Sequence, residues 1–213
     1  MRVALTAILL FVLLIPFADQ SRAEVQVGLS ADSDGLKAFH LAIGDHFRVE
    51  YRDVVLARER HIPDQELPVV YFIAQQAGVA PGAVIKMRLG GQSWLQIAFN
   101  YGLDPSYFYV PVNRKPGPPY GKAYGHFKNK KKSQWRQIEL TDTEIVDLVN
   151  LRFIAEHYGY APEEVMKMRE KGKGFVIING EVKKAKEKTA QAYVGEEEAS
   201  KSQKSGKGKG KKK

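Results

Sequence analysis

The feature that most constrains how this chain can fold is an internal repeat. The segment Phe72–Arg88 aligns without gaps with Phe153–Arg169 at a constant spacing of 81 residues, and ten of the seventeen aligned positions are identical. Chance explains such a match poorly, whereas duplication of a structural unit explains it well. The match weakens after Arg169, although Gly91 still aligns with Gly172 and Trp94 with Phe175.

Each copy predicts a helix, a tight turn and a second helix. A glycine can adopt the left-handed conformation that ends a helix, and proline is favourable at the first position of the next one. A shorter third copy, Ile97–Pro105, has the same pattern. The repeat positions expected to serve this packing are Ala74, Gly78, Pro81, Ala98, Gly102, Pro105, Ala155, Gly159 and Pro162.

Two further helices are expected around these copies. Val49–Arg60 resembles the second helix of such a unit, so the array is expected to begin near residue 40. Thr141 and Glu144 have the spacing of a capping box, which predicts a helix that places Leu148, Leu151, Ala155 and Tyr158 on one face.

The spacing of small residue, glycine and apolar residue is similar to that of a helix-turn-helix. Met87–Pro105 in particular resembles the helix-turn-helix segments of bacterial resolvases and regulators. The resemblance implies DNA recognition by the second helix, but that helix offers few base-reading side chains in the first copy and begins with Glu163 and Glu164 in the last. We therefore expect hairpins that act as packing units, with DNA recognition as an alternative.

The N-terminus predicts export. Arg2 precedes an apolar run from Val3 to Phe17, and small residues stand at Ser21 and Ala23, as signal peptidase prefers. The run is shorter than the roughly 20 apolar residues that a membrane-spanning helix needs. We expect a signal peptide at 1–23 with cleavage after Ala23, no transmembrane segment in the mature chain, and a periplasmic or extracellular location. The alternatives are an uncleaved anchor and a cytosolic protein.

The net charge of +9 lies mostly in two segments. The Lys-rich tail 201–213 contains seven lysines and no acid, which predicts a disordered tail, and no acid occurs between Asp104 and Glu139. Aromatic residues alternate with cations in 111–137, a mixture suited to binding and stacking on anionic ligands. The candidate polyanion-binding residues are Lys115, Tyr120, Lys122, Tyr124, Lys128, Lys130, Lys131, Lys132, Trp135 and Arg136. The alternative is that the aromatic residues pack over the repeats while the lysines are solvated.

The fold class expected is mainly α. Its duplicated helix-turn-helix-like hairpins are joined by an irregular basic loop and followed by a disordered C-terminal tail. Prolines and glycines in 111–137 argue against regular structure there. Residues 174–179 are compatible with either a strand or a helix. The expected divisions are a signal peptide 1–23, an N-terminal linker 24–37, a first helical repeat region 38–110, a Pro/Gly/Lys/aromatic linker 111–137, a second helical repeat 138–182, and a charged helix with the Lys-rich tail at 183–213.

Motifs of catalytic chemistry are missing from the sequence. The chain has no cysteine, and its five histidines form no His-Glu-x-x-His motif. We expect no cofactor and no metal site, although His40, Asp45 and His46 could approach one another. The sequence is similar to those of exported bacterial proteins that have no assigned activity. It favours a non-catalytic binding or scaffold protein of the bacterial envelope that associates with a polyanion or an envelope protein. The alternatives are a nucleic-acid-binding helix-turn-helix protein and an enzyme whose site is not visible in the sequence.

Overall fold

Gly78 and Gly159 end two of the helices, and Pro81 and Pro162 begin two others, as the sequence indicates. The computed structural model describes residues 33–206. It is mainly helical, with no strand among those residues. The elements in chain order are α1 Ser33–Phe47, α2 Tyr51–Glu59, η1 Asp64–Glu66, α3 Leu67–Ala77, α4 Pro81–Leu89, α5 Trp94–Asn100, η2 Pro105–Phe108, α6 Gly121–Lys128, η3 Lys132–Gln137, α7 Asp142–Tyr158, α8 Pro162–Glu170 and α9 Phe175–Gly206, where η denotes a 3₁₀ helix.

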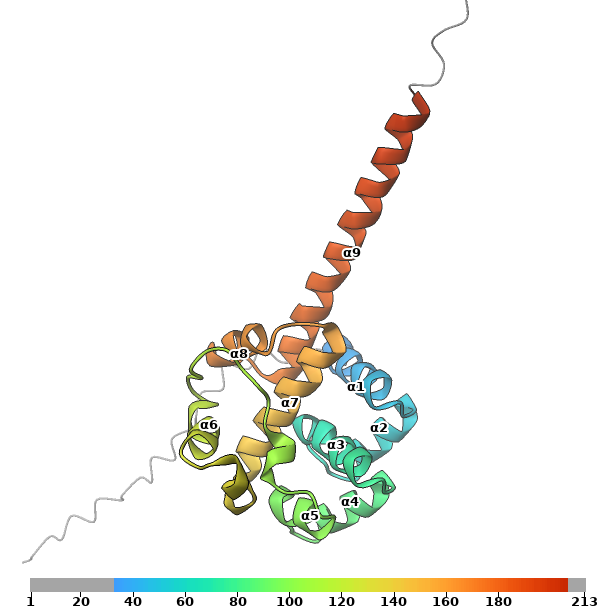
Figure 1. The fold of residues 1–213 in the computed structure, drawn as a ribbon. Coiled ribbons are helices and arrows are strands. Elements are labelled where there is room, and N and C mark those ends of the chain that lie inside the picture. The colour runs from blue at the N-terminus through green and yellow to red at the C-terminus, as the bar shows by residue number, and fades with distance from the viewer. Residues whose placement is uncertain (1–32, 207–213) are drawn as a thin grey trace, which may run out of the picture.

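Helix α7 lies at the centre of the body (Figure 1). The capping box expected at its start is present, since the Thr141 hydroxyl accepts from the Glu144 backbone N–H and the Glu144 carboxylate accepts from the Thr141 N–H. The predicted face of α7 is buried, and so are most of its other residues. A helix that is buried on nearly all sides must be covered on every side, and α1, α3, α5, α8 and α9 pack against it.

The same turn geometry occurs after four helices. A residue with positive φ follows α1, α3, α5 and α7, namely Arg48, Gly78, Gly102 and Gly159. Six residues later an apolar side chain is fully buried, and these side chains are Val54, Val84, Phe108 and Val165. In the third case the segment after the turn is the 3₁₀ helix η2 rather than an α-helix. The chain thus enters each second helix in the same way and packs it back through one apolar residue.

The aligned segments at spacing 81 also share a side-chain arrangement. The guanidinium of Arg88 lies 4.6 Å from the centroid of the Trp94 ring and donates to the Gln92 carbonyl at 3.1 Å. At the aligned positions, Arg169 lies 4.8 Å from the Phe175 ring and donates to the Lys173 carbonyl at 3.2 Å. Each arginine therefore fixes the turn that leads into a third helix, α5 or α9. Of residues 174–179, which the sequence left open between strand and helix, 175–179 form the start of α9 and Gly174 immediately precedes it.

Arg88 also joins the two halves of the chain. It pairs with both carboxylate oxygens of Glu66 at 2.9 Å and with Asp142 at 2.6 Å. Asp142 in turn accepts the Trp94 backbone N–H at 2.7 Å. Because these four residues come from η1, α4, α5 and α7, the network holds the start of the central helix against the first repeat region.

Three expectations about the connecting and terminal segments need correction. The linker at 111–137 is not irregular throughout, because α6 and η3 lie within it. The N-terminal linker ends earlier than expected, since α1 begins at Ser33. Helix α9 continues to Gly206, so 201–206 are helical where a disordered tail was expected. The signal peptide at 1–23 and residues 207–213 of the tail lie outside the described residues.

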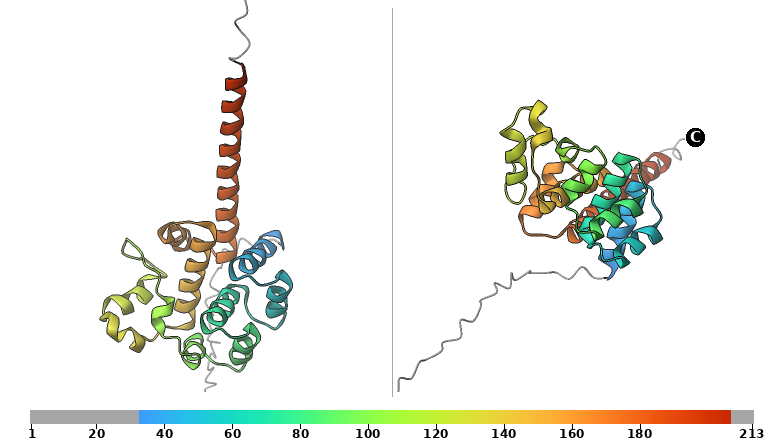
Figure 2. Two further views of the ribbon diagram at one scale, coloured as in Figure 1. Left: turned by 45° about the vertical axis from the view of Figure 1, so that its right-hand side comes forward. Right: turned by 90° about the horizontal axis from the view of Figure 1, so that it is seen from below.

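Helix α9 begins in the body and leaves it. Phe175, Ile178 and Val182 are buried against the other helices, whereas residues 184–192 are exposed. Figure 2 shows the rest of α9 projecting away from the body, and α6 on the side of α7 opposite to α1. Among the described residues, no helix is both long and apolar enough to cross a membrane.

Candidate functional site

A pocket of about 360 Å³ lies in the basic aromatic segment that the sequence singled out. Its wall comes from α6, from η3 and from the extended chain 109–116. Four of the candidate residues line it, namely Lys115, Tyr124, Lys128 and Trp135. The lining residues that were not candidates are Tyr109, Val112, Arg114, Pro116, Gly121, Gly125 and Phe127. This volume is at the small end of the range typical of small-molecule sites.

Aromatic rings form the apolar wall. The ring centroid of Tyr109 lies 5.7 Å from that of Tyr124, 5.0 Å from that of Phe127 and 4.7 Å from that of Trp135. Tyr124 and Phe127 are buried, while Tyr109 and Trp135 are half-buried and show part of their surface to the pocket. Aromatic rings in contact at such distances stabilise one another's orientation.

Hydrogen bonds to the backbone hold the rings in place. The Tyr124 hydroxyl donates to the Val110 carbonyl at 2.6 Å, and the Trp135 indole N–H donates to the Phe127 carbonyl at 3.2 Å. Burial raises the pKa of Tyr124, with the nearby Tyr109 and Glu163 adding to the effect. The Tyr124 hydroxyl therefore stays protonated and remains a donor at neutral pH.

The central helix and α8 position the extended chain. Arg152 on α7 donates to the backbone carbonyl of Tyr109 at 2.7 Å. Glu170 on α8 accepts from the Arg114 guanidinium at 2.7 Å and from the Gly117 N–H at 3.3 Å. These contacts are long-range in sequence, so the pocket exists only when the second repeat has folded.

The cations at the pocket differ in how they are paired. Arg114 is neutralised by Glu170. Lys115 and Lys128 are exposed, and within the described part of the chain neither side chain forms a hydrogen bond or an ion pair. The pocket therefore combines an apolar aromatic wall with two unpaired positive charges.

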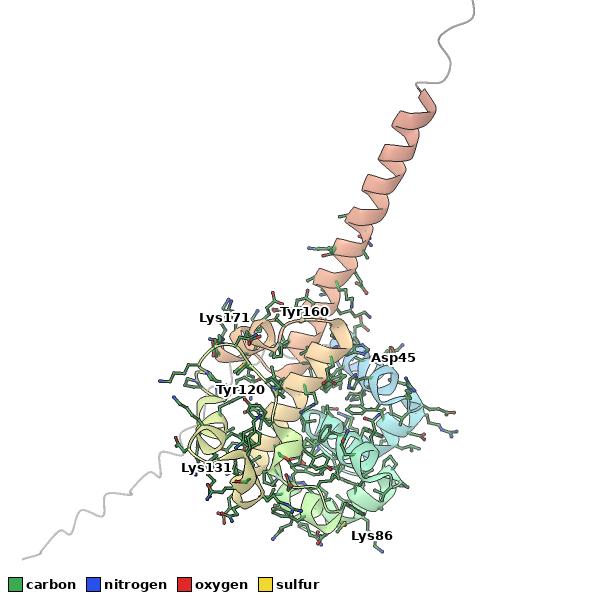
Figure 3. All side chains as sticks on the ribbon, viewed as in Figure 1. Asp45, Lys86, Tyr120, Lys131, Tyr160 and Lys171 are labelled. Atoms are coloured by element: carbon green, nitrogen blue, oxygen red, sulfur yellow. The ribbon has the colours of Figure 1, made fainter. Side chains whose placement is uncertain are left out.

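The other candidate residues do not line the pocket. Lys122, Lys130, Lys131 and Lys132 are exposed, and Lys132 lies 5.9 Å from the Trp135 ring. Arg136 forms an exposed ion pair with Asp104 at 3.2 Å. Tyr120 is fully buried between α6 and the second repeat, so its ring cannot stack on a ligand (Figure 3).

A periodic pattern in the sequence could have revealed α6. Tyr120, Ala123, Tyr124 and Phe127 are all buried and recur at intervals of three and four residues, as on the inner face of a helix. The density of proline and glycine obscured that pattern. No local sequence pattern marks Tyr109 and Arg114 as pocket residues, because contacts with residues distant in the sequence bring them there.

In the part of the chain that the structure describes, the histidines and acidic residues give no sign of a metal centre. Nowhere in residues 33–206 do three or more His, Cys, Asp or Glu side chains gather in a way that could hold a metal ion. His40 Nε2 is 2.7 Å from Asp64, and His46 lies near Glu156 and His157 instead.

The described residues form an all-helical protein in which aromatic rings and unpaired cations meet at the pocket beside α6. Comparison of the chain with protein families, with curated proteins and with solved structures finds no match in any of the three. The functional argument therefore depends on the residues of the pocket and its surroundings.

Proposed function

We propose that this protein is a non-catalytic binding protein of the bacterial envelope that associates with anionic polymers through residues 111–137. The observation that carries the proposal is the set of exposed lysines around the aromatic pocket, of which Lys115, Lys128 and Lys130 have no acidic partner among the described residues. A field of unpaired cations attracts a polyanion and releases its counterions. The export signal expected at the N-terminus supports the proposal, because the bacterial envelope is rich in such polymers.

The helical repeats act as the scaffold for this region. The matching environments of Arg88 and Arg169 support a duplicated three-helix unit, in which α3, α4 and α5 correspond to α7, α8 and α9. Glu170 at the end of α8 and Arg152 on α7 hold the pocket chain. The second unit therefore serves as the support on which the binding region is built.

DNA recognition by the helix-turn-helix-like units has less support. In α4, the helix that would enter the major groove, Arg88 is already engaged by Glu66 and Asp142. This leaves Lys86 as the one cation of α4 without an ion pair in the described structure. In α8, the corresponding helix of the other copy, the first turn contains Glu163 and Glu164, which would repel phosphates.

The test is the salt dependence of binding to heparin, used as a model polyanion. The logarithm of the affinity should fall linearly with the logarithm of salt concentration. The triple variant Lys130→Gln, Lys131→Gln, Lys132→Gln should reduce the steepness of this fall by about 3, roughly one for each lysine replaced. Lys131 lies at the edge of the α6 and η3 region (Figure 3).

A matched control removes the same charge from the other side of the body. Lys37, Arg60 and Lys86 are exposed on α1, at the end of α2 and on α4, and changing all three to Gln should leave the slope closer to that of the unaltered protein. Equal slopes for the two triple variants would contradict the proposal, because the charge would then act without regard to its position.

A further inference from the structure

Two glycines, Gly121 and Gly125, lie on the helix face that lines the pocket. Gly121, Tyr124, Gly125 and Lys128 are spaced by three and four residues and line the pocket from one face of α6. A Cβ atom built on Gly125 would meet no atom within 4 Å. A side chain at Gly125 would extend into this space, so Gly125 keeps the pocket open although glycine lowers helix propensity. At Gly121 a Cβ atom would instead lie 3.3 Å from the Pro116 carbonyl oxygen, so the glycine there permits a close approach of the preceding chain.

The pocket presents two different kinds of surface to a ligand. The rings of Tyr109 and Trp135 form a partly exposed apolar wall, and hydrogen bonds and ring contacts fix the orientation of their neighbours. A rigid apolar wall of this kind favours the face of a ring-shaped group. Lys115 and Lys128 add two positive charges that no described acidic side chain neutralises.

We propose that this pocket binds a ring compound carrying a phosphate monoester, with the ring against Tyr109 and Trp135 and the phosphate near Lys115 and Lys128. A phosphate monoester has about −1.5 to −2 charges at pH 7, which matches two unpaired lysines. A phosphodiester inside a polymer carries one charge and would leave a lysine unpaired. This inference rests on the proposed function, in which residues 111–137 bind anions, and it names the anionic group that the pocket of this region binds.

The direct measurement is calorimetric titration of the full chain with adenosine 5′-monophosphate. Adenosine and inorganic phosphate serve as probes for the ring alone and the anion alone. We expect the nucleotide to bind at least tenfold more tightly than either fragment, because only the nucleotide uses both surfaces. Its affinity should fall as pH drops below about 6, where the monoester takes up its second proton. Adenosine that binds as tightly as the nucleotide would overturn the inference.

Gly125→Leu tests the pocket without removing an interaction that holds the fold. The new side chain starts in open space and occupies the pocket face of α6, and leucine favours a helix more than glycine does. We expect at least a tenfold loss of nucleotide affinity and no loss of thermal stability. Gly82→Leu in α4 is the matched control, since Gly82 is also helical with no atom within 4 Å of its Cβ. It should leave nucleotide affinity unchanged.

Two sets of lysine variants separate this inference from the broader proposal. Lys115→Gln with Lys128→Gln should abolish nucleotide binding, whereas the variant of Lys130, Lys131 and Lys132 should keep it and bind heparin more weakly. Heparin binding without nucleotide binding would overturn the pocket assignment alone, and failure of the unaltered protein to bind either probe would overturn both proposals.

A competition experiment distinguishes the source of the phosphate. A 5′-phosphorylated oligonucleotide that displaces the nucleotide more strongly than its unphosphorylated form assigns the site to chain ends. A phosphorylated oligonucleotide that does not compete assigns it to free monomers. An unphosphorylated oligonucleotide that competes as well as the phosphorylated one would overturn the requirement for a monoester.

Discussion

At the scale of single residues, Arg48 and His61 have positive φ at positions where the corresponding later turns have glycine. Arg48 has φ 57° and His61 has φ 67°, while Gly78 and Gly91 occupy the matching places after α3 and α4 with φ 67° and 84°. The interval between the two positive-φ residues is the same in both cases, and it recurs between Gly159 and Gly172. The turn geometry is thus kept even where the residue best suited to it is missing.

This difference gives a pair of opposite predictions. Gly78→Ala should lower the free energy of unfolding by about 1 kcal/mol, because a Cβ strains the left-handed conformation although it meets no atom within 4 Å. Arg48→Gly should raise it by about 0.5 kcal/mol, since relief of that strain exceeds the added entropy of the unfolded chain. Denaturant titration measures both values. Changes of the same sign in the two variants would show that the conformation is not what limits stability at these turns.

At the scale of elements, α6 shows where expectation from sequence fails. Prolines before it and glycines within it argue against a helix, yet residues 121–128 form one. Its buried face packs against aromatic residues outside the helix, including Tyr109 and Trp135. Tertiary packing of an apolar face commonly outweighs intrinsic propensity in short helices. The Thr141 capping box and the Gly78 and Gly159 helix ends, in contrast, were predictable because each is decided within a few residues.

The junction of α1 and α7 contains a histidine pair. The ring centroids of His46 and His157 are 6.0 Å apart, and Phe153 contacts both rings. Burial lowers the pKa of His46 and of His157 below 6.5, and the positive charges of His46 and Lys186 add to the effect at His157 while Asp45 opposes it. Glu156 lies 3.9 Å from His46 and is largely exposed.

The sign of the pH effect follows from these lowered pKa values. Below pH 6.5 the unfolded chain takes up protons that the folded protein does not, so the free energy of unfolding should fall as the pH decreases from 6.5. Each histidine contributes a slope of at most about 1.4 kcal/mol per pH unit. Chemical denaturation between pH 7.5 and 5 should show a smaller decrease for the double variant His46→Gln, His157→Gln. If the free energy of unfolding decreases equally in the double variant and the unaltered protein, the pH effect comes from the carboxylates, which both proteins share.

At the scale of the whole molecule, the buried part and the projecting part of α9 have separate roles. Up to residue 192, where the described side chains of α9 end, Val182 is the last buried apolar residue. Lys186 makes the last long-range contact in that range, to the Tyr158 carbonyl at 2.6 Å. The helix then extends past the body with no other element beside it (Figures 1 and 2). Residues 184–192 are exposed and therefore add no buried apolar surface to the core.

Truncation tests this division of α9. A chain that ends after Gln191 should keep its thermal unfolding midpoint within about 2 °C, because the described part of the helix that buries apolar surface ends well before that point. A chain that ends after Gly174 lacks Phe175, Ile178 and Val182 and should unfold many degrees lower. Differential scanning calorimetry of both chains gives the answer. A large decrease for the longer chain would show that the projecting part stabilises the body.

The sequence by itself determined the helical class, the ends of the repeated helices and the region in which cations and aromatic residues concentrate. Helix caps, turn glycines and apolar spacing act over a few residues, so their effect can be deduced without coordinates. Only the tertiary structure decided that Lys115 and Lys128 are unpaired beside a pocket while Tyr120 is buried. Those outcomes depend on Arg152, Glu163 and Glu170, which contact the pocket chain across more than forty residues of sequence. No local pattern encodes such contacts, because they form only when the second unit packs against the segment that joins it to the first.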